Sequence, residues 1–194
     1  MGFSFKKSET LEENVRRVIL RQGNKALNHL EKEDGDLHHG VHQARKRFKQ
    51  IRAILRLVRP ALGDKYTMEN VAYRDMGREL SDLRDAAARL ECFDELMDAF
   101  SGELEDGAFA EVRAIMEQDR DAAAQGHVHE QEAMAQVAAD LRKALKRAEK
   151  LKVPGDAAEV IQGGVKKTYK RGYRAMHEAY TEPSDEIFHE WRKR

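Results

Sequence analysis

Only three prolines interrupt this chain of 194 residues, at Pro60, Pro154 and Pro183, and the stretches between them are rich in Ala, Leu, Glu, Lys and Arg. These five residue types favour the α-helix, whereas a proline inside a helix removes a backbone hydrogen bond and clashes with the preceding turn. The chain therefore has few places where a helix must stop. We expect an all-α fold in which helices joined by short turns form antiparallel bundles.

Apolar residues at helical spacing predict six or seven helices. Ser8 or Thr10 can cap the first helix, and Pro60 stops the second. The expected ranges are about 10–32, 37–59, 66–100 with possible kinks, 108–125, 129–151, 157–180 and from 185 onward. The clearest linker is 152–156, which contains Pro154 and Gly155. We therefore expect a first helical repeat over 1–151 and the start of a second over 157–194.

A short motif occurs twice. The residues 42–47, HQARKR, are echoed 147 residues later by 189–194, HEWRKR. Both copies begin just inside an expected helix, and the first helix continues well beyond its copy. We expect a two-repeat architecture whose second repeat is incomplete.

Charge is segregated along the chain, although the formal net charge is zero. Residues 42–59 hold seven Lys or Arg and no acid, residues 82–121 hold thirteen acids and four Arg, and residues 141–174 hold eleven bases and three acids. This distribution suggests a basic site within an otherwise acidic body.

On a helical wheel, the basic residues of 37–59 form one ridge immediately beside the apolar face. The ridge comprises Arg45, Lys49, Arg52, Arg56 and Arg59, and the apolar face comprises Ala44, Phe48, Ile51, Ile54, Leu55 and Val58. A ridge at the edge of a buried face would line a groove or channel.

The range 157–180 repeats this design. Its apolar sector contains Ile161, Val165, Tyr169, Tyr173, Met176 and Tyr180, and the adjacent sector contains Lys166, Lys167, Lys170, Arg171, Arg174 and His177. Like charges four residues apart disfavour a helix by a few tenths of a kcal/mol per pair, on the order of 0.2–0.5. Such ridges make sense if an anion or an acidic helix neutralises them.

Guanidinium groups bind phosphate oxygens in bidentate fashion, lysines act as mobile charges, and histidines add hydrogen bonds. The ridges therefore favour binding of a polymeric, phosphate-like anion. Two alternatives remain open: the ridges pair with the chain's own acids in 82–121, or they dock an acidic protein, which would make the chain a helical adaptor.

Three segments together resemble the CHAD domain, an α-helical domain named for its histidines. They are 41–62, VHQARKRFKQIRAILRLVRPAL; 77–90, GRELSDLRDAAARL; and 184–194, SDEIFHEWRKR. The resemblance covers essentially the whole chain. It implies two similar helical bundles around a basic channel that binds inorganic polyphosphate, and in some members an association with polyphosphate granules.

Carried over onto this sequence, the resemblance gives anion-lining roles to residues of all three segments. They are His42, Arg45, Lys49 and Arg52 of the first, Arg84 of the second with Asp85 as its orienting partner, and His189, Arg192 and Lys193 of the third. From the ridges we add Lys46, Arg56, Lys167, Lys170, Arg171 and Arg174 as candidate polyphosphate-binding residues.

Other classes of function have little support in the sequence. There is no phosphate-binding glycine loop and no glycine-framed nucleophile, so we expect no enzyme activity and no cofactor. His38 with His42, and His127 with His129, are weak candidates for a metal site because no cysteine or carboxylate set accompanies them. Aromatic residues are not interleaved with the 42–59 ridge, which disfavours nucleic acid.

No apolar run is long enough to span a membrane, and Cys92 is the only cysteine, so that no intrachain disulfide can form. We expect a cytoplasmic protein with no membrane partner. A homo-oligomer is possible, because an incomplete second repeat would leave apolar surface exposed.

Overall fold

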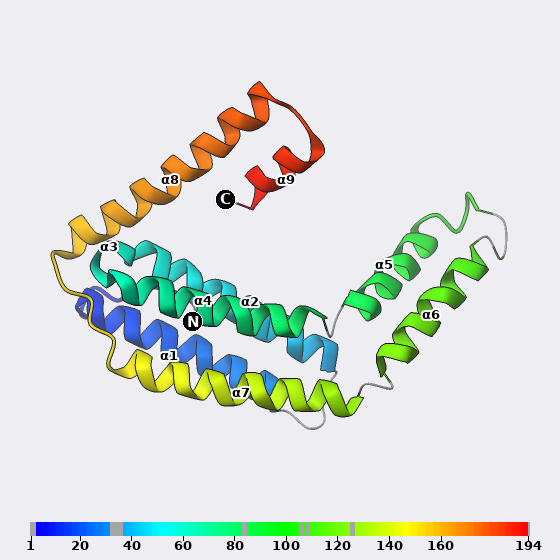
Figure 1. Cartoon of the computed structure of the whole chain (residues 1–194), viewed down its shortest axis with the longest axis horizontal. Coiled ribbons are helices and arrows are strands. Elements are labelled where there is room, and N and C mark those ends of the chain that lie inside the picture. Colours follow the sequence, from blue (N-terminus) through cyan, green and yellow to red (C-terminus); the bar gives the residue numbers. More distant parts are fainter. Residues whose placement is uncertain are drawn as a thin grey trace.

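The computed structural model describes residues 3–31, 37–82, 85–104, 107, 109–124 and 127–193, and within these ranges it contains nine α-helices and no strand. The prediction of an all-α fold is confirmed. In chain order (Figure 1) the helices are α1 (Leu11–Leu30), α2 (Leu37–Leu57), α3 (Arg59–Leu62), α4 (Asp64–Asp82), α5 (Asp85–Ala99), α6 (Ala110–Ala124), α7 (His127–Glu149), α8 (Ala157–Thr181) and α9 (Asp185–Arg192).

Four of these helices form the body of the protein. α1 packs on α2, α2 on α4, α4 on α7 and α7 on α1, so that the four close a ring in which neighbours run in opposite directions (Figure 1). The apolar residues predicted on the second helix are all buried in this ring: Ala44, Phe48, Ile51, Ile54, Leu55 and Val58. The bundle is therefore built on the faces that the periodicity indicated.

The ends of α1 and α2 follow from local chemistry. Thr10 is the N-cap of α1: its hydroxyl accepts from the backbone N–H of Glu13 at 3.2 Å, and the Glu13 carboxylate accepts from the backbone N–H of Thr10 at 2.8 Å. α2 ends at Leu57, two residues earlier than expected, and Pro60 lies in the first turn of the short α3. A proline is tolerated there because that N–H has no helical partner to lose.

An ion pair between a buried carboxylate and an exposed arginine joins α4 to α7. Arg147 donates from Nε and Nη2 to the two carboxylate oxygens of Glu69, at 2.7 and 3.1 Å, and Glu69 is only 5% exposed. Tyr73, one turn along α4, is buried beside this pair, and burial together with the charge of Glu69 raises the pKa of its hydroxyl. A buried carboxylate needs such a partner, so this pair fixes α4 against α7.

The segment between α7 and α8, where we expected a linker, is attached to α1. Arg16 donates from Nε to the backbone carbonyl of Leu151 at 2.7 Å, and the backbone N–H of Val153 donates to the Glu12 carboxylate at 2.9 Å. Leu151 and Val153 are both buried. The direction in which α8 leaves the bundle is thereby set by contacts with α1.

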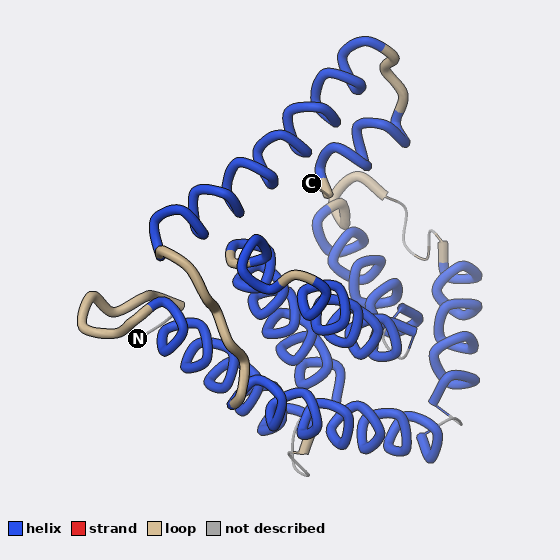
Figure 2. The backbone as a smooth tube through the Cα atoms, turned by 60° about the vertical axis from the view of Figure 1, so that its left-hand side comes forward, coloured by secondary structure: helices blue, strands red, loops and turns tan. Residues whose placement is uncertain are grey.

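Two helical hairpins project from the bundle, α5–α6 at one end and α8–α9 at the other (Figures 1 and 2). The helices of each hairpin pack on one another, and α8 packs at least as extensively on α2 and α3. The α8–α2 contact is close because Gly164 lies against the backbone of Leu57. Of the apolar sector predicted for 157–180, Ile161 packs against the core, whereas Val165, Tyr169 and Tyr173 are each more than half exposed.

Replacing Gly164 with alanine should detach α8 from α2. A Cβ at this position would overlap the Leu57 carbonyl oxygen and lie 2.6 Å from the carbonyl carbon. We expect Gly164→Ala to lower the free energy of unfolding by about 1–3 kcal/mol, or to open α8 locally, as measured by chemical denaturation and amide hydrogen exchange.

Gly172→Ala is the matched control on the same helix, because nothing lies within 4 Å of a Cβ there. It should be neutral or stabilising by up to about 1 kcal/mol, since alanine favours a helix over glycine. Equal effects of the two substitutions would contradict the packing of α8 on α2.

Candidate functional site: a basic cleft between α2, α4 and α9

A cleft of about 730 Å³ lies between α2, α4 and α9. Eight of the twelve residues that line it are Arg or Lys, and none is Asp or Glu. The basic residues are Arg45, Lys49, Arg52 and Arg56 of α2, Arg74 and Arg78 of α4, and Arg192 and Lys193 at the end of α9. Phe48, Tyr73, Gly77 and Ser81 complete the lining.

The α2 side of the cleft is the predicted ridge. Residues spaced three or four apart share one face of a helix, which explains why four of its five members reach the same cleft. Arg52 is half-buried and donates from Nε to the side-chain oxygen of Asn70 on α4 at 3.1 Å. This bond orients the guanidinium. Arg47, in contrast, bonds to Gln22 and Gln50 and does not border the cleft.

The α4 side was not anticipated from the sequence. Arg74 and Arg78 lie one turn apart, but acids follow each of them directly, so no acid-free run marks them. Their spacing of four residues on a helix whose other face is buried is the one signal that could have identified them. Arg74 forms an ion pair with Asp75, with Nε and Oδ1 2.7 Å apart, whereas Arg78 is exposed.

The third side comes from the second copy of the repeated motif. Arg192 occupies in 189–194 the position that Arg45 occupies in 42–47, and both residues line the cleft. Ser184 caps α9 by accepting from the backbone N–H of Ile187 at 3.2 Å. Ring contacts among Tyr180, Phe188 and Trp191, with centroids 5.7–6.2 Å apart, hold α9 against α8.

Positive charges crowd one another in the cleft. The pKa of Arg52 is lowered, first by burial and then by the charge of Arg56, with Arg74 and Arg78 acting in the same direction. Among the residues that the structure describes, no carboxylate forms an ion pair with Arg45, Lys49, Arg52 or Arg56. An anion in the cleft would remove this repulsion.

In the described part of the chain, the acids of segment 82–121 form no ion pair with the cations of the cleft. The ion pairs seen there are local, from Arg113 of α6 to Asp94 of α5 and to Glu117. Among the cleft bases, Arg74 pairs with its neighbour Asp75, and Lys193 with Glu190 one turn away, with Nζ and Oε1 2.6 Å apart.

Several predicted binding residues lie outside this cleft. His42 and Lys46 are exposed on α2, and His189 is exposed on α9, where its Nδ1 lies 3.5 Å from Nη2 of Arg192. The α8 residues do not border the cleft either: Lys167, Lys170, Arg171 and Arg174 belong to a helix that leaves the bundle, and Arg174 lines a separate shallow pocket with Tyr173 and His177.

Some predictions fall beyond what the structure describes. Arg84 lies outside the described residues, as do the side chains of Asp85, His38, His127 and His129. Within the described residues there is no group of three or more His, Cys, Asp or Glu side chains that could hold a metal ion. In the same residues, no helix is both long and apolar enough to cross a membrane.

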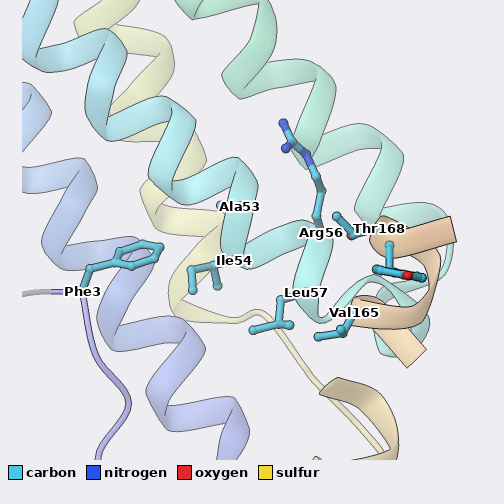
Figure 3. A pocket seen from close by; sticks show the side chains of 8 residues that line it. Phe3, Ala53, Ile54, Arg56, Leu57, Val165 and Thr168 are labelled. Carbon is cyan, nitrogen blue, oxygen red and sulfur yellow. The ribbon is translucent and has the colours of Figure 1, made fainter. Parts of the chain in front are cut away.

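A second, apolar pocket of about 480 Å³ adjoins the cleft between α2 and α8. Phe3, Ile54, Leu57 and Val165 are among its lining residues, and Arg56 is its single charged one (Figure 3). In Figure 3 the Arg56 side chain extends away from the apolar side chains. The guanidinium therefore belongs functionally to the basic cleft.

Removing one cleft charge should stabilise the protein when no anion is bound. We expect Arg78→Gln to raise the free energy of unfolding at low salt by a few tenths of a kcal/mol, on the order of 0.2–0.5, because one source of repulsion is lost. Thermal denaturation at two salt concentrations measures this gain, which high salt should abolish. Lys25→Gln on α1, outside the cleft, is the control, and an equal gain there would contradict the idea of crowding.

The family model for the CHAD domain matches residues 21–194, which is nearly the whole chain. No curated protein and no solved structure matches the sequence. The matched range contains all three helices that line the cleft, and with this match and its all-helical fold the chain belongs to the CHAD-domain family.

Proposed function

We propose that the basic cleft binds inorganic polyphosphate and that the protein acts as a binding module without catalytic activity. The observation that carries the proposal is the composition of the cleft: eight Arg or Lys side chains from three helices and no carboxylate among the lining residues. Such a concentration of like charge is unfavourable in an empty protein and becomes favourable when a polyanion is bound.

The arrangement suits a linear anion better than a single phosphate. At 1.5 Å per residue, the α2 residues from Arg45 to Arg56 span about 16 Å along one side of the cleft. Arg74 and Arg78 provide cations on α4, and Arg192 and Lys193 provide them on α9. A chain of phosphates lying along α2 could contact all three helices, whereas one phosphate could reach only part of the set.

The residue types also support phosphate. Six of the eight cations are arginines, whose planar guanidinium matches the oxygens of a phosphate group in bidentate geometry. The aromatic side chains of the cleft, Phe48 and Tyr73, are both 1% exposed, so neither offers a face on which a nucleobase could stack. This arrangement favours a polymer of phosphate alone over nucleic acid.

Membership of the CHAD-domain family is consistent with a role related to polyphosphate. We extend the proposal to location: the protein works in the cytoplasm and associates with polyphosphate granules. Retention of the protein on isolated granules, and its release by added soluble polyphosphate, would test this part independently of the cleft.

The direct test is a titration of the purified chain with long-chain polyphosphate at several salt concentrations. We expect Arg45→Glu with Arg52→Glu on α2 to abolish tight binding. Arg74→Gln with Arg78→Gln on α4 should weaken binding by about tenfold or more, because a charge-assisted hydrogen bond contributes roughly 1.5–3 kcal/mol. The affinity of the unmodified protein should fall steeply with salt, since binding releases condensed counterions.

Lys167→Gln with Lys170→Gln on α8 separates the cleft from the second ridge of the sequence. The loss of affinity should be smaller than for the α4 pair, although both variants lose two charges. A larger loss from the α8 pair would place the site on α8. Binding of an equal phosphate concentration of single-stranded nucleic acid with the same affinity would contradict selectivity for polyphosphate, and binding of neither polymer would favour the adaptor alternative.

A further inference from the structure

The exposed apolar side chains of this protein are concentrated on its two projecting hairpins. Among the described residues, twelve large apolar side chains are exposed, and ten of them belong to α5–α6 or α8–α9 and their turns. On the first hairpin they are Leu96, Phe100, Phe109, Val112 and Ile115; on the second they are Val165, Tyr169, Tyr173, Tyr180 and Phe188. Clustered apolar exposure of this kind marks an interaction surface.

The two hairpins carry opposite charge beside these apolar side chains. On α6, Glu111, Ile115 and Asp119 follow one another at intervals of four residues and so share one face of the helix. Both carboxylates are exposed and form no ion pair with another described residue. The α5–α6 hairpin thus presents an apolar strip beside acids that no described cation neutralises.

On α8, Val165, Tyr169 and Tyr173 form the corresponding strip, and the two tyrosine rings stack with centroids 6.2 Å apart. Lys166, Lys170 and Arg174 each follow one of these residues directly, so a line of cations runs beside the apolar strip. Like the acids of α6, Lys166 and Lys170 are exposed and form no ion pair within the described residues. The cations of α8 therefore complement the acids of α6.

We propose that the α5–α6 hairpin of one copy of this chain docks on the α8–α9 hairpin of a second copy. Two helical hairpins packed face to face form a four-helix bundle, which is the stable way to bury one apolar strip on each. Within a single chain the two hairpins leave opposite ends of the α1–α2–α4–α7 bundle (Figure 1) and do not pack on one another. A second copy of this chain offers each hairpin a partner of opposite charge with a matching apolar strip.

Reciprocal docking gives a closed dimer with two equivalent contacts. The ten side chains are 39–69% exposed in the single chain. With aromatic side chains burying about 150–250 Å² when fully covered, each contact would bury on the order of 1,000 Å², which is sufficient for a specific interface. The α8–α9 hairpin also contributes Arg192 and Lys193 to the basic cleft. The residues substituted below on α6 and α8 do not line the cleft, so the dimer and the polyphosphate site can be tested separately.

The test is the mass of the full chain in solution, measured by light scattering or sedimentation over a range of concentrations without polyphosphate. We expect a concentration-dependent dimer that high salt weakens. Lys166→Glu with Lys170→Glu should abolish the dimer, and so should Glu111→Lys with Asp119→Lys, because each change places like charges opposite one another. Lys146→Glu with Lys150→Glu at the end of α7 makes the same charge change outside both hairpins and should leave the dimer intact.

Mixing the two monomeric variants in equal amounts should restore a dimer. In one contact the substituted, acidic α8 faces the substituted, basic α6, and in the other the unchanged acidic α6 faces the unchanged basic α8, so that opposite charges meet in both. One chain that carries all four substitutions should also dimerise. Circular dichroism confirms that each variant is folded. A monomer at every concentration would overturn the proposal, as would a dimer that survives the α6 substitutions, since that dimer would be formed by α8–α9 alone.

Discussion

Helix α2 is the element on which the rest of this structure depends. One of its faces is buried in the four-helix bundle, and the adjacent face carries the arginines and lysine of the cleft. Because hydrophobic burial fixes the rotation of α2, it also fixes the direction of the basic ridge, and the ridge faces α4. The core thus brings the cations of α2 and α4 close together, and the free energy of hydrophobic packing outweighs the repulsion between them.

The bundle tolerates this repulsion because its other contacts hold α4 in place. The bidentate pair of Glu69 with Arg147 ties α4 to α7 on the side away from the cleft, and Asn70 on α4 accepts a hydrogen bond from Arg52. The cleft therefore exists before any ligand arrives. A preformed set of cations loses little entropy on binding, which favours affinity for a rigid or repetitive anion.

The third side of the cleft differs from the other two because its helix, α9, is not part of the four-helix bundle. α9 reaches it at the end of a projecting hairpin whose contacts with α8 are a cluster of partly exposed aromatic rings. Arg192 and Lys193 are thus attached to the cleft through α8, whereas the α2 and α4 residues belong to helices of the bundle. The same hairpin carries the basic strip of α8, so that one element serves both the cleft and the surface that we assign to a second copy.

The sequence by itself determined the helical fold, the buried faces of α1 and α2, and the basic ridge of α2, because these depend on local propensity and on a spacing of three to four residues. It also pointed to both copies of the repeated motif, and the structure brings Arg45 and Arg192 to one cleft. Arg74 and Arg78 were not predicted as binding residues, because an acid directly follows each of them and they belong to no acid-free run of basic residues. Tertiary structure alone decided that Arg74 and Arg78 line the cleft with α2 whereas Lys167 and Lys170 do not. The path of α8 is set by contacts between residues far apart in the chain, such as Gly164 with Leu57 and Arg16 with Leu151.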